Sequence, residues 1–260
     1  MPAPTALFDG AAPTTIIWLG AIYFVAYLLK GAFGLGALTP AVLFGSLVVG
    51  PHHAIVLAAL ANGASQVQFL ADGWRSGDRV LVGRILLPLA IGAALGLFVF
   101  ARLDAALLSF VLGIALGVIV LADLLSMIER AAARIDLRAR PVQWLLASIS
   151  GAIGGLTGAG GLFFLAAYFR VACPDPRSFR GTTLLVSAVT VGWRTVLLAA
   201  AGFITAGHLA ETAMLLPAIV GGGWVGARLV QRLPARAFFA GVQVLMLMGA
   251  ASLVVKGWPW

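Results

Sequence analysis

The chain has 260 residues, of which 62% are hydrophobic and 10% are charged, and its mean hydropathy is +1.06. Soluble domains carry about 25% charged residues, so this composition excludes a soluble globular protein and also a disordered one. Long continuous apolar runs argue against a membrane β-barrel, whose strands alternate over about 10 residues. The net charge of +8 is typical of basic membrane loops, so we expect a lipid bilayer, and no nucleic acid, as partner.

The first apolar stretch covers residues 14–49 and is interrupted by Lys30 and three glycines. Thr39 and Pro40 then suit the beginning of a helix. The segment 40–49 would be about 15 Å long, half the thickness of the hydrocarbon core. Continuous apolar segments follow at residues 53–70, 85–101 and 105–125.

The second half of the chain follows the same plan after a charged linker at residues 126–141. Its interrupted stretch, 142–169, has two apolar arms at 142–153 and 161–170, both short for a membrane span. Three continuous segments follow, at 181–201, 209–230 and 237–255. We expect each interrupted stretch to be a hairpin whose glycine-rich tip is buried inside the protein. Two short full crossings per stretch are the alternative.

Matching landmarks indicate an internal duplication. Leu87-Pro88 precedes Gly92 as Leu216-Pro217 precedes Gly221, 129 positions later, and a GLG at 34–36 matches a GAG at 158–160, 124 positions later. The prediction is therefore an all-α polytopic membrane protein of two repeats. Residues 1–125 and 142–260 each supply a glycine-broken hairpin and three transmembrane helices, and residues 126–141 form a cytoplasmic basic linker between them.

The distribution of Lys and Arg predicts how the chain crosses the membrane. Eight uninterrupted spans would leave 8 basic residues on one side and 7 on the other. If both hairpins return to the side they entered, 13 basic residues share one side, and only Arg102 and Lys256 lie on the other. Because basic loops stay in the cytoplasm, the second arrangement is favoured. It places both termini outside and inverts the two halves relative to each other.

Arg194 lies well inside its predicted span, where an arginine costs about 2.5–3.5 kcal/mol. Ser187, Thr190 and Arg194 share one face of a helix and suggest a polar lining with an anion ligand. Two alternatives are that Arg194 pairs with an acid or that its side chain extends to a membrane interface. The candidate acids are Asp123 and Glu211, both near the ends of their spans.

Other polar residues within the apolar segments complete the predicted substrate site. Lys30 closes the first hairpin arm, where a cation also suits a helix C-terminus. Asn62, Ser65 and Gln66 share a face of the next helix, where hydrogen bonds between helices are the alternative role. Backbone N–H groups at the hairpin tips suit an anion, so the site includes these tip residues: Gly34, Gly36, Thr157, Gly158 and Gly160.

Several chemistries have no motif in the chain. There is no phosphate-binding GxxxxGK[ST], no GxSxG and no HExxH, so we expect no enzyme activity and no cofactor. The adjacent His52 and His53 point apart on a helix and have no third ligand near them in sequence, so we expect no metal site. The single cysteine, Cys173, forms no internal disulfide.

The motifs GAFGLGALTP, GAIGGLTGAGG, FRGTT and LPAIVGGGWVGARL, with the polar helix after GPHHA, resemble the sulfite exporter TauE/SafE family. The resemblance covers residues 30–255. It departs at the first tip, where Ala37 and Leu38 stand in place of the family's run of glycines. The resemblance implies a multi-pass permease of the bacterial plasma membrane that exports sulfite, sulfonates or sulfoacetate-like anions.

We therefore expect a secondary transporter that exports a small sulfur oxyanion or organosulfonate by alternating access. Two alternatives stay open: a passive anion channel, and a membrane accessory protein that transports nothing. A homo-oligomer is also open.

Overall fold

The computed structural model describes residues 13–33, 38–125, 127, 130, 136–137, 139–159, 161–173, 175–229 and 235–258. Every regular element in these residues is a helix. The first half of the chain contributes α1 (Pro13–Phe33), α2 (Leu38–Val49), α3 (Pro51–Ser76), α4 (Arg79–Phe100) and α5 (Ala105–Leu124). The second half contributes α7 (Arg140–Thr157), α8 (Gly161–Ala172), α9 (Pro176–Ala200), α10 (Ala206–Leu229) and α11 (Ala235–Lys256).

Five of these helices are long and apolar enough to cross a membrane: α1, α4, α5, α9 and α10. Shorter apolar helices accompany them, at Leu38–Val49 and Val242–Lys256. Large apolar side chains such as Ile17, Val67 and Val255 lie on the surface. Apolar side chains exposed in this number suit contact with lipid. The predicted all-helical membrane protein is confirmed at this level.

Short-range signals explain where several helices begin. Asp78 caps α4 by accepting hydrogen bonds from the backbone N–H groups of Val80 and Leu81, both at 3.0 Å. Asp104 caps α5 and Asp175 caps α9 in the same way. Such caps satisfy backbone donors that have no partner within the helix.

The two interrupted stretches are indeed broken, but their helices are longer than predicted. Helix α2 begins at Leu38, so Pro40 lies in its first turn as expected, whereas Thr39 lies within the helix. Helix α7 has 18 residues, against 12 expected for that arm. It starts at Arg140, inside the predicted linker, and continues through Gly154 and Gly155 because Gly155 packs against the backbone of Ala93. Helices tolerate such glycines where close packing compensates for the lower helix propensity.

The tip of the second hairpin is built around Gly158. This residue has φ +77°, a left-handed conformation that ends α7 and suits glycine. The Thr157 hydroxyl donates to the carbonyl of Ala159 at 2.5 Å and accepts from its N–H at 3.1 Å. The chain then reverses, so that the start of α8 lies beside α7. There the Ser150 hydroxyl donates to the carbonyl of Gly161 at 2.5 Å. Gly34, Gly36 and Gly160 lie outside the described residues.

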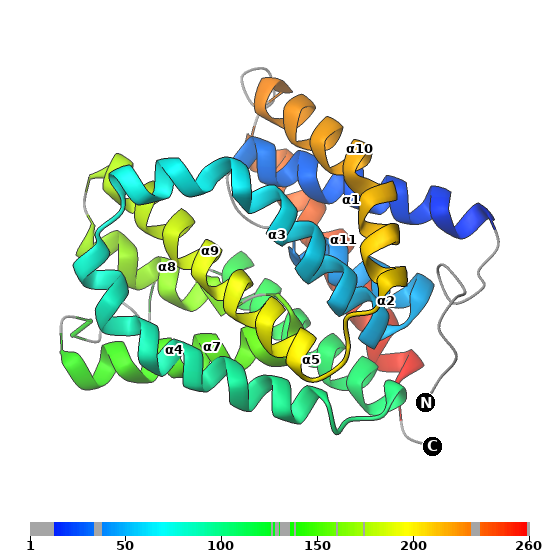
Figure 1. The fold of residues 1–260 in the computed structure, drawn as a ribbon, viewed down its shortest axis with the longest axis horizontal. Coiled ribbons are helices and arrows are strands. Elements are labelled where there is room, and N and C mark those ends of the chain that lie inside the picture. The colour runs from blue at the N-terminus through cyan, green and yellow to red at the C-terminus, as the bar shows by residue number, and fades with distance from the viewer. Residues whose placement is uncertain are drawn as a thin grey trace.

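The helices associate mainly as four pairs, α1 with α10, α3 with α9, α4 with α7 and α5 with α11. Figure 1 shows α3 and α9 between the α1–α10 pair and the α4–α7 pair. Glycines allow the close contacts, for example at Gly92 and Gly222. A Cβ at Gly92 would collide with the carbonyl oxygen of Ser148, and a Cβ at Gly222 would collide with that of Phe24.

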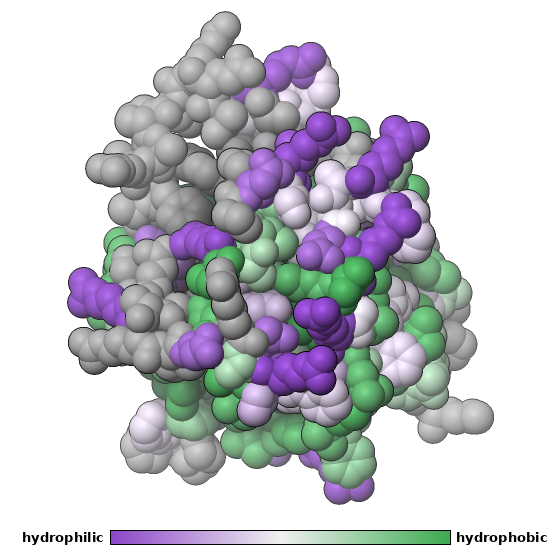
Figure 2. Space-filling model, turned by 90° about the vertical axis from the view of Figure 1, so that its left-hand side faces the viewer, coloured by the Kyte–Doolittle hydropathy of each residue, from purple (hydrophilic) through white to green (hydrophobic). Residues whose placement is uncertain are grey.

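Exposed arginines gather at the end of the molecule where α3 and α8 finish and α4, α7 and α9 start. Figure 2 shows hydrophilic side chains at this end. The exposed arginines at these helix ends are Arg75, Arg79, Arg84, Arg140, Arg170, Arg177 and Arg180. At the opposite end, Lys256 donates to the carbonyl of Leu47 at 3.3 Å.

Candidate functional site

Lys30 lies in the last turn of α1, and its ammonium group contacts α3. Its Nζ donates to Oδ1 of Asn62 at 2.6 Å and to Oγ of Ser65 at 2.7 Å. The same nitrogen lies 5.5 Å from the centroid of the Tyr27 ring. Lys30, Asn62 and Ser65 are all buried. The structure thus brings three of the predicted site residues together, and the cation is held by hydrogen bonds between two helices.

Gln66, one residue beyond Ser65 on α3, connects this cluster to α9. Its Nε2 donates to the hydroxyl of Ser187, and both side chains are buried. Its Oε1 is buried without a hydrogen-bond partner in the described part of the chain. A half-turn of the amide would let the Ser187 hydroxyl donate to Oε1 and free the N–H donors of Gln66. Thr190 donates instead to the carbonyl of Val186 in its own helix, at 2.7 Å.

Arg194, about 10 Å along α9 from Ser187, is the second buried cation. Only 5% of its surface is exposed. Its Nε and Nη2 have no hydrogen-bond partner among the described residues. Burying an arginine costs free energy unless its N–H groups find acceptors, because they lose their hydrogen bonds to water. The unpaired donors therefore suit an acceptor that arrives from outside the protein, such as an anion.

The Arg194 guanidinium lies against the tip of the second hairpin. A Cβ placed on Gly158 would be 2.7 Å from Nη1 and 2.9 Å from Nη2 of Arg194. Glycine is therefore favoured at this position for two reasons. It adopts the left-handed conformation, and it leaves room for the guanidinium. Sequence reasoning named both residues, but it did not predict that they touch.

The acids suggested as partners of Arg194 bind elsewhere. Glu211 lies 2.5 Å from Nε2 of His53, and Asp123 accepts a hydrogen bond from Gln243 at 2.7 Å. Helix α10 brings Glu211 and His208 next to His53, a proximity that the sequence did not reveal. Even so, the described residues contain no group of three or more His, Cys, Asp or Glu positioned to hold a metal ion.

Sequence reasoning also missed an aromatic face on α1. The rings of Tyr23 and Tyr27 stack with their centroids 6.3 Å apart. Tyr23 lies two turns and Tyr27 one turn before Lys30. The Tyr23 side chain is fully buried, and its hydroxyl has no hydrogen-bond partner in the described residues. The spacing of Tyr23, Tyr27 and Lys30 at i, i+4 and i+7 was the available signal.

Comparison with known families identifies the chain. The model of the family described as sulfite exporter TauE/SafE matches residues 19–253. The chain therefore belongs to this family, and it is a multi-pass membrane transporter rather than an enzyme. Membership implies transport of sulfur-containing anions in the broad sense. No curated protein sequence and no solved structure matches the chain.

Proposed function

From its membership of the TauE/SafE family, we propose that this protein exports a small sulfur oxyanion or organosulfonate across the plasma membrane by alternating access. Arg194 is the observation that carries the proposal. A buried guanidinium with unpaired N–H groups beside a hairpin tip matches the geometry and charge of a sulfite or sulfonate group. A second buried cation, Lys30, adds positive potential nearby.

The site combines residues from both halves of the chain. Gln66 on α3 and Ser187 on α9 join the two halves, and Gly158 brings the second hairpin to Arg194. A site between two halves suits a carrier, because relative motion of the halves exposes it to one side at a time. Gly34, Gly36 and Gly160 stay part of the proposed site, with their backbone N–H groups as donors to the anion.

Reciprocal contacts support the two repeats. Gly92 faces Ser148 and Ala152, and Gly222, 130 positions later, faces Phe24 and Leu28. The partners Ser148 and Phe24 are 124 positions apart, as are Ala152 and Leu28. If the halves correspond, exchanging them converts the α1–α10 pair into the α7–α4 pair, and α3–α9 and α5–α11 each join corresponding helices. A two-fold relation between the halves would produce this pattern.

The charge distribution supports an inverted orientation of these repeats. The exposed arginines that share one end of the molecule would lie in the cytoplasm. The beginnings of α3 and α10 and the end of α11 would then face the outside. This orientation places both termini outside the cytoplasm.

Flux through purified protein tests the function. In proteoliposomes loaded with radiolabelled sulfite or taurine, we expect Arg194→Ala to lower transport by at least about tenfold, since a hydrogen bond to a charged group contributes about 1.5–3 kcal/mol. Arg194→Lys keeps the charge but loses the planar donor pair, so its transport should lie between those of the native protein and the alanine variant.

Arg79→Lys is the matched control, because this exposed arginine lies outside the proposed site and contacts the carbonyl and the ring of Trp74. Transport that persists in Arg194→Ala at normal protein levels would remove Arg194 from the site. Initial rates that rise linearly with substrate, without saturation, would favour a passive channel over a carrier.

A further inference from the structure

Tyr23, in the middle of α1, carries a polar atom that the proposed anion site does not use. Its side chain is fully buried, and its hydroxyl has no hydrogen-bond partner in the part of the chain that the structure describes. A buried polar atom without a partner lowers stability, and phenylalanine would fill the same space without that cost. The hydroxyl therefore suits a partner that reaches it in another state of the protein.

On one side of Tyr23 lies the cluster around Lys30. Tyr27 is one turn closer to Lys30 on the same face of α1, and its ring stacks on that of Tyr23 with the centroids 6.3 Å apart. The Lys30 Nζ lies 5.5 Å from the centroid of the Tyr27 ring and donates to Asn62 and Ser65 on α3. A single stacked ring thus separates Tyr23 from this buried cation.

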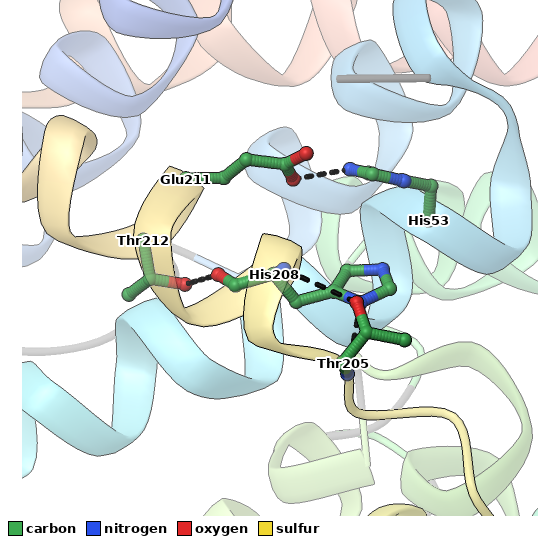
Figure 3. Close-up of polar contacts among 5 residues, drawn as sticks. All are labelled: His53, Thr205, His208, Glu211 and Thr212. Carbon is green, nitrogen blue, oxygen red and sulfur yellow. Dashed lines mark hydrogen bonds and ion pairs between the residues drawn. The ribbon is translucent and has the colours of Figure 1, made fainter. Parts of the chain in front are cut away.

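On the other side of Tyr23 lies Glu211, near the beginning of α10. The two side chains are close enough for an electrostatic interaction. Oε2 of Glu211 lies 2.5 Å from Nε2 of His53, and Figure 3 shows Glu211 directed from α10 toward His53 on α3. Helices α1, α3 and α10 all begin at this end of the molecule (Figure 1), which faces the outside in the proposed orientation.

These side chains form a row of polar groups between α1, α3 and α10, which we call the outer polar row. From the outer end inward, its members are His53, Glu211, Tyr23, Tyr27, Ser65, Asn62 and Lys30. Tyr23 and Tyr27 also belong to the main apolar cluster of the protein. Polar groups are costly among apolar side chains, so a row of them in this cluster indicates a function.

The inner end of the row reaches the depth of Arg194. Gly63, the residue after Asn62, faces α9, since a Cβ placed on it would be 3.7 Å from Cγ1 of Val191. Val191 lies one turn before Arg194 on α9. The outer polar row thus extends from the level of the proposed anion site to the end of the molecule that would face the outside.

We infer that the anion leaves along the outer polar row and that the Tyr23 hydroxyl donates a hydrogen bond to it on the way. A neutral phenol suits this role, because it binds an oxyanion more weakly than a guanidinium does and so releases it more readily. Glu211 forms the outer boundary of the row, and its contact with His53 must separate before the anion leaves. The inference rests on the proposed export and orientation, to which it adds the route and a residue that acts along it.

Tyr23→Phe tests the hydroxyl, because this variant keeps the ring. In proteoliposomes we expect the initial rate of sulfite or taurine export to fall at least about tenfold, as for the loss of a hydrogen bond to a charged group. The Tm in detergent should equal or exceed that of the native protein, because a buried hydroxyl without a partner is removed. A merely structural tyrosine would show the opposite pattern, a lower Tm with an unchanged rate per folded protein.

Tyr168→Phe is the matched control. Tyr168 on α8 is also buried, but it belongs to a second apolar cluster, with Phe169 and Cys173. Loss of its hydroxyl should leave the export rate unchanged. A lower Tm in Tyr23→Phe, or an export rate equal to that of the native protein, overturns the role of Tyr23.

Cysteine labelling tests the route without measuring export. Ala26 is fully buried on the same face of α1 as Tyr23, and Ala250 on α11 is 3% exposed. Each is changed to cysteine in a Cys173→Ala background, and intact cells are treated with sulfonatoethyl methanethiosulfonate, an impermeant sulfonate that reacts with thiols. We expect Ala26→Cys to react at least about tenfold faster than Ala250→Cys, because only the former lies on the route that opens to the outside.

The two measurements separate the route from the substrate. Labelling of Ala26→Cys in a protein that exports neither sulfite nor taurine would reject the proposed substrates and leave an anion route along this row standing. Export by the native protein, with Ala26→Cys reacting no faster than Ala250→Cys, would reject the route alone.

Discussion

The two buried cations have different surroundings, which gives them different roles. Lys30 is held by side chains of α3, with Asn62 and Ser65 as acceptors. Arg194 has donors that no described residue satisfies. An ammonium group has three N–H donors and a guanidinium five, so Arg194 has more to offer an incoming anion. We therefore propose that Lys30 acts mainly by fixing α1 against α3 and by adding positive charge.

Removing the Lys30 ammonium should therefore lower stability. In Lys30→Met, Asn62 Oδ1 loses its 2.6 Å hydrogen bond and keeps only the longer one from the Ser65 hydroxyl, at 3.4 Å. A poorly satisfied buried acceptor costs about 1–3 kcal/mol. We expect a lower Tm in detergent. The double variant Lys30→Met, Asn62→Leu should recover part of the loss, because the orphaned amide is gone.

Lys256→Met is the control for a lysine that is not buried. The exposed Lys256 ammonium group donates a hydrogen bond to the Leu47 carbonyl at 3.3 Å. Removing this ammonium group should change the free energy of unfolding by less than about 0.5 kcal/mol. An unchanged Tm in Lys30→Met would show that the contact with α3 contributes nothing.

At the scale of the helices, two glycine-lined contacts decide the packing. Apolar side chains gain little by leaving lipid for one another, so helices in membranes associate through close backbone approach. Gly92 and Gly151 allow α4 and α7 to approach, and Gly31 and Gly222 do so for α1 and α10. The sequence shows these glycines but not which helix each of them contacts.

A methyl group at Gly92 should disrupt the α4–α7 contact. Its Cβ would collide with the Ser148 carbonyl, which cannot rotate away as a side chain could. We expect Gly92→Ala to destabilise the protein by about 1–3 kcal/mol, measured as Tm in detergent.

The matched control is Gly83→Ala on the same helix. Nothing lies within 4 Å of its Cβ, so the higher helix propensity of alanine should leave stability equal or slightly raised. Equal Tm values for the two variants would mean that α4 and α7 do not meet closely in the membrane.

At the scale of the whole molecule, α1 begins and α11 ends at the same end of the structure (Figure 1). Helix α11 packs against α2. Lys256, at the end of α11, donates a hydrogen bond to the carbonyl of Leu47 near the end of α2. The exposed arginines at the ends of α3 and α8 and at the starts of α4, α7 and α9 lie at the opposite end. From the positive-inside rule, we propose that both termini lie outside.

Reporter fusions check this orientation. Alkaline phosphatase is active only outside the cytoplasm, and green fluorescent protein exported in unfolded form stays dark. We expect active phosphatase and dark fluorescent protein at both the N- and C-terminus, and the reverse for reporters placed in the linker 126–141. A fluorescent fusion at either terminus would refute the orientation.

The sequence by itself determined the class of the protein and its helices. Composition, apolar segment lengths and the order of the glycine motifs predicted an all-helical membrane transporter of this family, because the bilayer imposes length and hydropathy on each span. Arg194 and Lys30 stood out because charge is costly there. The C-terminal end of α7 was less predictable. Glycines such as Gly154 and Gly155 end a helix only where close packing does not compensate for their low helix propensity.

Only the tertiary structure decided which residues meet. Lys30 contacts Asn62, which is 32 positions away in the chain, and His53 contacts Glu211, which is 158 positions away. Helical periodicity places a residue on a face, but it does not say which helix covers that face. In a membrane the apolar faces are interchangeable, so pairing depends on glycine contacts and buried hydrogen bonds whose partners are distant in the chain.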